Sequence, residues 1–234
     1  MTAKDIHGHA LSGASPAAAE HYQQALEAYH RYGGRPMKHL GRALDDSPGF
    51  VMAHLLKAYM TGVGTDPPTQ AIGHAALDAA RDLPADSRER AHRAAAEALL
   101  AGHTRAAGRI LEDVAIDHPR DLVALQAGQL VDFMTGDARM LRDRIARALP
   151  AWVDGMPNHH ALLAMQAFGL EETGDYARAE AAGRRAIELE PRNGWAQHAV
   201  AHVLEMQERR AEGVAWMTAD PDAWSRQSFF AIHN

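Results

Sequence analysis

The sequence predicts an all-α fold, namely an α-solenoid of about six helix pairs followed by the start of a seventh. Each expected pair consists of two helix-length segments rich in Ala, Leu, Arg and Glu, which are strong helix formers. No run of alternating β-branched residues indicates a strand. Prolines separate the pairs at intervals of 30 to 38 residues, at Pro16, Pro48, Pro84, Pro119, Pro157, Pro191 and Pro221. A fixed period of this length with paired helices is typical of a helical-repeat solenoid.

The expected helices can be placed in chain order from their caps and turns. Glycines mark the turns within pairs at Gly33-Gly34, Gly102, Gly136 and Gly174, and Pro67-Pro68 begins a helix. We expect one solenoid over residues 1–234, less ordered over 1–14 and ending in an incomplete repeat over 223–234. The predicted pairs are 16–31 with 35–46, 50–63 with 67–82, 86–101 with 103–117, 121–135 with 137–149, 158–173 with 175–190, and 193–208 with 209–218.

The fifth predicted pair has the most specific local pattern. Gly174 supplies the turn and Tyr176 follows two residues later, while Ala179 and Gly183 are small enough for close helix packing and Pro191 closes the unit. This arrangement resembles a tetratricopeptide repeat.

Several longer phrases resemble one group in particular, the tetratricopeptide repeat protein 38-like family. They lie at residues 15–22, 48–54, 159–172, 195–206, 212–216 and 229–234, and the portion from 159 to 234 is the most specific. The resemblance implies a longer all-helical repeat protein of which this chain is an amino-terminal portion. An interior repeat buries its apolar face on the next one. We therefore expect the apolar run at residues 228–232 to promote self-association or partial unfolding.

Composition narrows the classes of function. The net charge is −6 and no basic run occurs, so we expect no nucleic-acid partner. The chain has no cysteine, which excludes disulfides, thiolate chemistry and cysteine-ligated metals. No apolar run approaches the roughly 18 residues of a membrane span, and the amino terminus lacks the apolar core of a signal peptide. We expect a cytoplasmic protein without a membrane partner.

The sixth pair carries a column of polar groups. His198, His202 and Glu205 follow at i, i+4 and i+7, so they lie on one helix face. Aligned to the repeat, this face lines the concave groove that such repeats form with their first helices. The same count puts His92 on the groove side of the third pair. The predicted ligand-binding groove comprises His160, Phe168, Glu171, Glu172, His198, His202 and Glu205.

Three interpretations of the column compete. The histidines can be packing groups within the repeat interface, or they can bind a ligand in the groove. They can also serve a metal, because His198 and His202 at i and i+4 with Glu205 suit zinc; His233 or the pair His159 and His160 can complete such a site. The metalloprotease pattern is absent, since Ala199 follows His198.

We therefore predict a scaffold that binds a peptide, a protein segment or a small polar ligand in a His/Glu-lined groove. The alternative is an enzyme, for instance a metal-dependent hydrolase, with Glu171 and His202 as candidate catalytic residues. No cofactor is required by the first hypothesis. Zinc or a similar divalent metal at His198, His202 and Glu205 belongs to the second.

Overall fold

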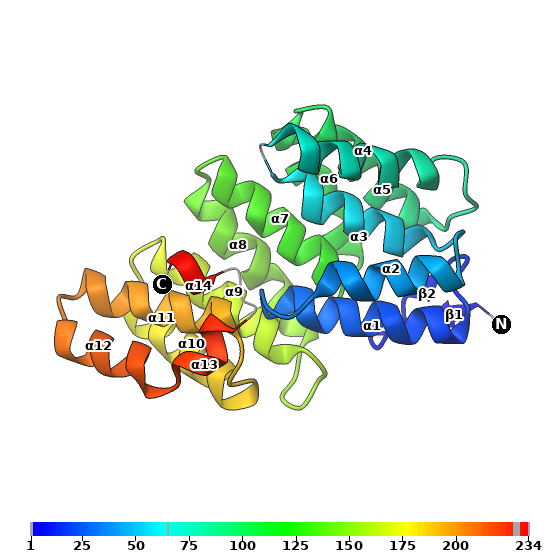
Figure 1. Cartoon of the computed structure of the whole chain (residues 1–234). Helices are drawn as coiled ribbons and strands as arrows, with labels where there is room; N and C mark the ends of the chain where they lie inside the picture. Colours follow the sequence, from blue (N-terminus) through cyan, green and yellow to red (C-terminus); the bar gives the residue numbers. More distant parts are fainter. Residues whose placement is uncertain (1, 65, 227–229, 234) are drawn as a thin grey trace. The chain divides into compact units, whose positions relative to one another are not determined.

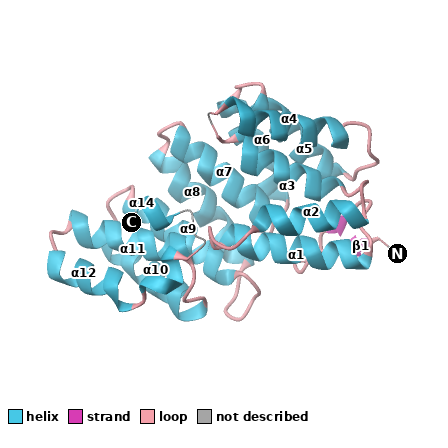
Figure 2. Ribbon diagram, in the orientation of Figure 1, coloured by secondary structure: helices cyan, strands magenta, loops and turns pink. Residues whose placement is uncertain are grey.

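The computed structural model describes residues 2–64, 66–226 and 230–233. Over these residues the chain is predominantly helical (Figures 1 and 2). The helices are α1 (Pro16–His30), α2 (Pro36–Asp46), α3 (Val51–Gly62), α4 (Pro67–Ala80), α5 (Ser87–Leu100), α6 (Thr104–Asp117), α7 (Leu122–Met134), α8 (Ala138–Ala148), α9 (His159–Glu171), α10 (Tyr176–Leu189), α11 (Gly194–Met206), α12 (Arg210–Ala219), α13 (Pro221–Ser225) and α14 (Phe230–His233), with a 3₁₀ turn η1 (Leu149–Ala151). The all-α helical-repeat class predicted from the sequence is confirmed, and its six helix pairs are α1 to α12.

Several of these helices begin at a short polar side chain. The aspartates that precede α4, α5, α7, α8 and α10 each accept a hydrogen bond from a backbone N–H of the first helical turn. Asn193 caps α11 in the same way. Such caps satisfy one of the otherwise unpaired N–H groups at a helix start. The recurring Asp or Asn one residue before the helix therefore fixes where these helices begin, in both the first and the second helix of a pair.

Turns within several pairs share one hydrogen-bond pattern. Gly174 has a φ of 81°, its N–H donates to the Glu171 carbonyl oxygen, and Asp175 N–H donates to the Leu170 carbonyl oxygen. Gly102 forms the same turn after α5. In the sixth pair Glu208 takes this place with a φ of 59°, a left-handed conformation that a non-glycine residue adopts at a cost.

Small residues allow neighbouring helices to approach closely. A Cβ atom added at Gly169 of α9 would lie 2.5 Å from the Leu141 carbonyl oxygen of α8. One added at Gly183 of α10 would lie 2.5 Å from Val200 Cγ2 of α11. Real side chains do not pack at such distances, so both glycines are required by packing rather than by turn geometry.

The seventh unit, expected from the sequence to be an incomplete repeat over residues 223–234, is described in part. It contains two short helices, α13 and α14, and residues 227–229 between them lie outside the described part of the chain. Arg226 has an extended backbone with a ψ of 119°, which ends α13. The incomplete repeat expected over residues 223–234 stays a prediction.

Contacts divide the chain into two compact units. Unit 1 comprises residues 1–26 and 36–136, and unit 2 comprises residues 27–35 and 137–234. Unit 2 thus includes the turn that follows α1, far away in the sequence. The single continuous solenoid over residues 1–234 stays a prediction.

The segment before α1, which we expected to be less ordered, contains a small antiparallel strand pair. β1 (Ala3–Lys4) pairs with β2 (Ala10–Leu11). Asp5 closes the turn between them, since its Oδ1 accepts hydrogen bonds from the N–H groups of His7 and His9, each at 2.9 Å. The sequence analysis missed these strands because they are two residues long and depend on one side-chain-to-backbone turn.

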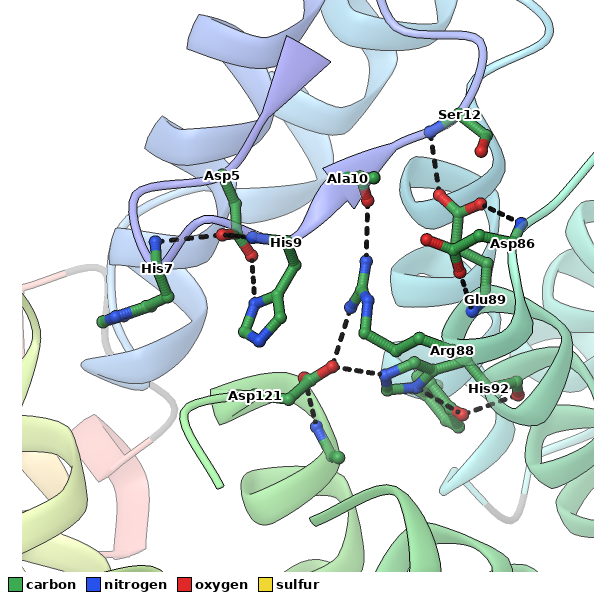
Figure 3. Close-up of polar contacts among 12 residues, drawn as sticks. Asp5, His7, His9, Ala10, Ser12, Asp86, Arg88, Glu89, His92 and Asp121 are labelled. Carbon is green, nitrogen blue, oxygen red and sulfur yellow. Dashed lines mark hydrogen bonds and ion pairs between the residues drawn. The ribbon is translucent and has the colours of Figure 1, made fainter. Parts of the chain in front are cut away.

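A buried polar network in unit 1 fastens this segment to the starts of α5 and α7 (Figure 3). Arg88 donates to Asp121 Oδ2 at 2.7 Å and to the Ala10 carbonyl oxygen at 2.9 Å. His92 Nε2 lies 2.9 Å from the same Asp121 oxygen. The Tyr59 hydroxyl donates to the His92 carbonyl oxygen at 2.7 Å and lies 3.1 Å from His92 Nδ1.

Electrostatics explains why this network is tolerated in the interior. Burial alone would raise the pKa of Asp121, but His92 and Arg88 hold that pKa well below its usual range. His92, which we expected to face the groove, is 0% exposed. That expectation was wrong, because the repeat count says which helix side a residue occupies but not whether other elements, here with Tyr59 and Asp121, cover it.

Candidate functional site

The candidate site lies in unit 2, on α9 and α11, which pack against each other. Asn193 fixes the start of α11, since its Oδ1 accepts from Ala196 N–H at 3.0 Å. Its amide nitrogen lies 2.9 Å from His160 Nδ1 and 3.3 Å from the His160 carbonyl oxygen on α9. One side chain therefore caps α11 and ties it to α9.

His160 is a structural partner in this arrangement. Burial lowers the pKa of its ring to about 4, so the imidazole is neutral near pH 7 and its Nδ1 accepts the hydrogen bond from Asn193. Neither of the two groups of potential metal ligands found among the described residues includes His160. The predicted groove residue is thus placed at the helix start, away from the histidine pair.

An aromatic cluster covers the neighbouring part of α9 and α11. The Phe168 and Trp195 ring centroids are 4.4 Å apart, and Trp195 stacks on Tyr32 at 4.8 Å with an interplanar angle of 17°. Phe230 of α14 packs against Trp195 at 5.4 Å and is only 2% exposed. Figure 1 shows α14 beside α11. We refer to the aromatic–histidine cluster as Tyr32, Phe168, Trp195, His198, His202, Phe230 and His233.

Tyr32 reaches the cluster from the turn after α1. Its φ of 54° is left-handed, and the preceding Arg31 accepts a backbone hydrogen bond from Gly194 N–H at 3.2 Å. Arg31 also forms an ion pair with Glu190 at 3.4 Å. These contacts hold the turn at the start of α11, where Tyr32 can stack on Trp195.

His198 and His202 lie together on α11, as their spacing predicted. Their ring centroids are 4.2 Å apart. His198 also stacks on Phe230 at 4.9 Å and contacts the His233 ring at 4.8 Å. The carboxy-terminal helix α14 therefore contacts the histidine pair through both an aromatic and an imidazole side chain.

Glu171 of α9 faces His202 across the helix interface. Glu171 Oε2 lies 3.5 Å from His202 Nδ1, and this oxygen is buried without a hydrogen bond among the described residues. Glu171 raises the pKa of His202, while burial and the neighbouring Glu171 raise the pKa of Glu172. A carboxylate beside an imidazole of raised pKa can exchange a proton, which is the chemistry required of the candidate catalytic pair.

Two groups of side chains in the described residues could hold a metal ion, and both contain His202. His198, His202 and His233 form one, and Glu171, Glu172 and His202 form the other; within each, the ligand atoms all lie within 4.8 Å of one another. Glu205, the third ligand considered from the sequence, belongs to neither group and is exposed.

The sequence analysis missed the participation of Tyr32, Phe230 and Asn193. The aromatic residue before Gly33-Gly34 was a usable signal for Tyr32, since a turn residue with a large ring often packs on another element. Asn193 was readable as a helix cap but not as a bond to His160. Phe230 had been assigned to the apolar run at residues 228–232; of this run, Phe230 is buried within unit 2, and residues 228–229 lie outside the described part of the chain.

Comparison with known proteins identifies no family. No protein-family model matches the chain. Among solved structures, the chain is similar to one titled "MamA MSR-1 C2", with 16% sequence identity and a TM-score of 0.48 over 74% of this chain and 95% of that one. The resemblance to the tetratricopeptide repeat protein 38-like family stays a prediction.

Within the described residues, every helix is too short or too polar to cross a membrane.

Proposed function

We propose that this protein is a binding scaffold whose α9–α11 face receives a short peptide segment bearing an aromatic side chain. The observation that carries the proposal is the burial of Phe230, which is 2% exposed and packs between Trp195 and His198. The α9–α11 face thus already accommodates an aromatic residue from a short helical segment of the same chain.

The chemistry of the face favours such a ligand over a purely apolar one. Trp195 and Phe168 offer aromatic surface, and aromatic pairs contribute about 0.5–1.5 kcal/mol beyond their buried area. The Trp195 indole N–H is buried without a hydrogen bond among the described residues. A carbonyl or carboxylate of an incoming segment that accepted a hydrogen bond from this N–H would therefore strengthen binding. Beside these rings, His202 and Glu171 provide polar contacts. An aromatic residue followed by polar groups matches this combination.

The proposal includes self-association as a special case. A segment that binds its own chain can bind a second copy by the same contacts, because exchange of an identical element is a low-cost route to dimers. The apolar end predicted from the sequence would then act through Phe230 rather than as an unspecific surface.

The test is a competition between the tethered segment and a free peptide. A fluorescein-labelled peptide of residues 225–234 is titrated with the F230A chain and with the wild-type chain, in the presence of a chelator. A tethered segment has an effective concentration on the order of 1 mM. We therefore expect the wild-type chain to bind the peptide at least about tenfold more weakly than the F230A chain.

A control peptide with Phe230→Ala should bind neither protein. Equal binding of both peptides to the F230A chain, or no binding at all, would contradict the proposal. Light scattering of the wild-type chain over a range of concentrations tests the exchanged dimer separately, and the F230A chain should remain monomeric where the wild type associates.

A further inference from the structure

The three histidines of the aromatic–histidine cluster converge from two elements. His198 and His202 lie on successive turns of α11, and His233 comes from α14. Their ring centroids are 4.2 Å apart for His198 and His202 and 4.8 Å apart for His198 and His233. The ligand atoms of all three lie within 4.8 Å of one another. Two of the three are thus fixed by one helix, and the third is carried by the segment that α11 holds.

These distances are close to those of a zinc site. With Zn–N bonds of about 2.0–2.1 Å, two nitrogens of a tetrahedral site lie about 3.4 Å apart. The histidine nitrogens therefore need to approach by up to about 1.4 Å, which rotation of the side chains can provide. His233 is exposed, so the site is open to an ion from solution.

The surroundings of His202 supply the outer contact that such sites have. Zinc-bound histidines usually direct their second ring nitrogen at a carboxylate or carbonyl, which fixes the ring and makes it a better ligand. Glu171 Oε2 is buried 3.5 Å from His202 Nδ1 and has no hydrogen-bond partner among the described residues. With Nδ1 directed at Glu171, the Nε2 atom of His202 is the one that can bind a metal.

We propose that a zinc ion binds between His198, His202 and His233 and holds α14 on α11. The inference rests on the proposed function, because it assigns zinc the role of regulating whether the α9–α11 face is occupied by the chain's own segment. Three protein ligands leave a fourth position to water. Zinc requires neutral imidazoles, so binding strengthens as pH rises and protons leave the ligands.

The experiment measures zinc binding by the full chain after treatment with a chelator. Isothermal titration with zinc chloride should give one tight site per chain. The H233A chain should lose this site, with affinity reduced more than about a hundredfold. The E171Q chain should bind about 10–100-fold more weakly, as expected for the loss of an outer carboxylate. Cobalt(II) should give the visible absorption of a low-coordinate nitrogen site in the wild type and not in H233A.

Two control variants separate the alternatives. His74 lies exposed on α4 in unit 1, so H74A should bind zinc as the wild type does. E172Q removes a ligand from the competing Glu171, Glu172 and His202 group and should leave the tight site intact. Loss of the site in E172Q but not in H233A would place the metal on the carboxylates and overturn the proposal. The absence of a stoichiometric site in the wild type, or equal affinity of H74A and H233A, would mean only adventitious zinc on surface histidines.

The outcome is separable from that of the proposed function. Peptide binding to the F230A chain is measured with a chelator present, so it does not depend on zinc. Peptide binding without a zinc site would leave the scaffold proposal standing and remove this one. A zinc site without peptide binding would leave the zinc site standing and remove the scaffold proposal.

Discussion

Replacement of Asp121 by Asn gives a sharp test of how unit 1 holds its amino-terminal segment. The amide keeps one oxygen to cap α7, where Asp121 Oδ1 accepts from Ala124 N–H at 3.0 Å. It also turns an NH₂ group toward Arg88 and His92, which are themselves donors. The substitution therefore removes the buried negative charge while it preserves side-chain volume and the helix cap.

The expected loss of stability is large because the remaining cation is buried. Arg88 is 5% exposed, and its Nε already has no hydrogen-bond partner among the described residues. Removal of one member of a buried ion pair typically costs about 3–5 kcal/mol, since the other charge remains unpaired in the interior. We expect D121N to lower the free energy of unfolding by this amount at pH 7.

Urea unfolding followed by far-UV circular dichroism measures the effect. The double variant R88M/D121N should recover most of the loss, because it removes both charges. D66N is the matched control: Asp66 caps α4 in the same unit but is exposed, so the cost should stay below about 0.5 kcal/mol. A loss below about 1 kcal/mol for D121N, or a double variant as unstable as the sum of the single ones, would refute the reasoning.

The same network predicts a pH dependence. The pKa of Asp121 is lowered in the folded chain, so its contribution to stability is present above the usual carboxyl pKa of about 4 and is lost as pH falls toward the folded value. The difference in stability between wild type and D121N should therefore shrink in acid, and a constant difference down to pH 2 would contradict the assignment.

Three further predictions concern packing, a turn and the histidine site. G169A should lower the free energy of unfolding, measured in urea, by about 1–3 kcal/mol, because its Cβ would overlap the backbone of α8. G41A is the control: nothing lies within 4 Å of a Cβ there, so the free energy of unfolding should rise by up to about 1 kcal/mol. Equal effects of the two substitutions would refute the packing argument. E208G should stabilise the chain by about 0.5–1 kcal/mol, since Glu208 has a φ of 59°, and a destabilised variant would show that its side chain matters more than its backbone. In E171Q the pKa of His202, followed by proton NMR, should fall toward the ordinary value of about 6.5, because Glu171 holds it above that value. A histidine whose pKa is raised in the folded chain stabilises the fold at pH values below its unfolded pKa, and this effect is lost as pH rises through the folded pKa. The free energy of unfolding of the wild type should therefore exceed that of E171Q most at mildly acid pH. An unchanged His202 pKa in E171Q would contradict the pairing.

The helical repeat was predictable because its causes are local. Ala- and Leu-rich segments, an Asp or Asn cap before several helices, and glycines such as Gly102 and Gly174 act within a few residues, so the helix pairs follow from the sequence. The association of His198 with His202 was predictable for the same reason, since one helix places them. Glu171 was expected on the preceding repeat, and it does lie beside His202.

The remaining features depend on contacts between residues far apart in the sequence. Tyr32 stacks on Trp195 across more than 160 positions, and no local pattern encodes that contact. His92 was expected to face the groove but is buried, and its burial depends on neighbours from other elements, including Asp121 at the start of α7. The apolar character of Phe230 was evident from the sequence, but the residues that it packs against, Trp195 and His198, were not. Periodicity therefore predicts which side of a helix a residue occupies, whereas the element that covers this side is set by tertiary packing.

The central claim is that the aromatic ring of Phe230 occupies the α9–α11 face. Nuclear Overhauser effects in a chain with isotope-labelled phenylalanine rings measure this placement directly, and F230A assigns the Phe230 signals. We expect cross-peaks between the Phe230 ring and the Trp195 indole and His198 imidazole protons, together with ring-current shifts of the Phe230 resonances. A Phe230 ring with unstructured chemical shifts and no cross-peaks to Trp195 would contradict the account.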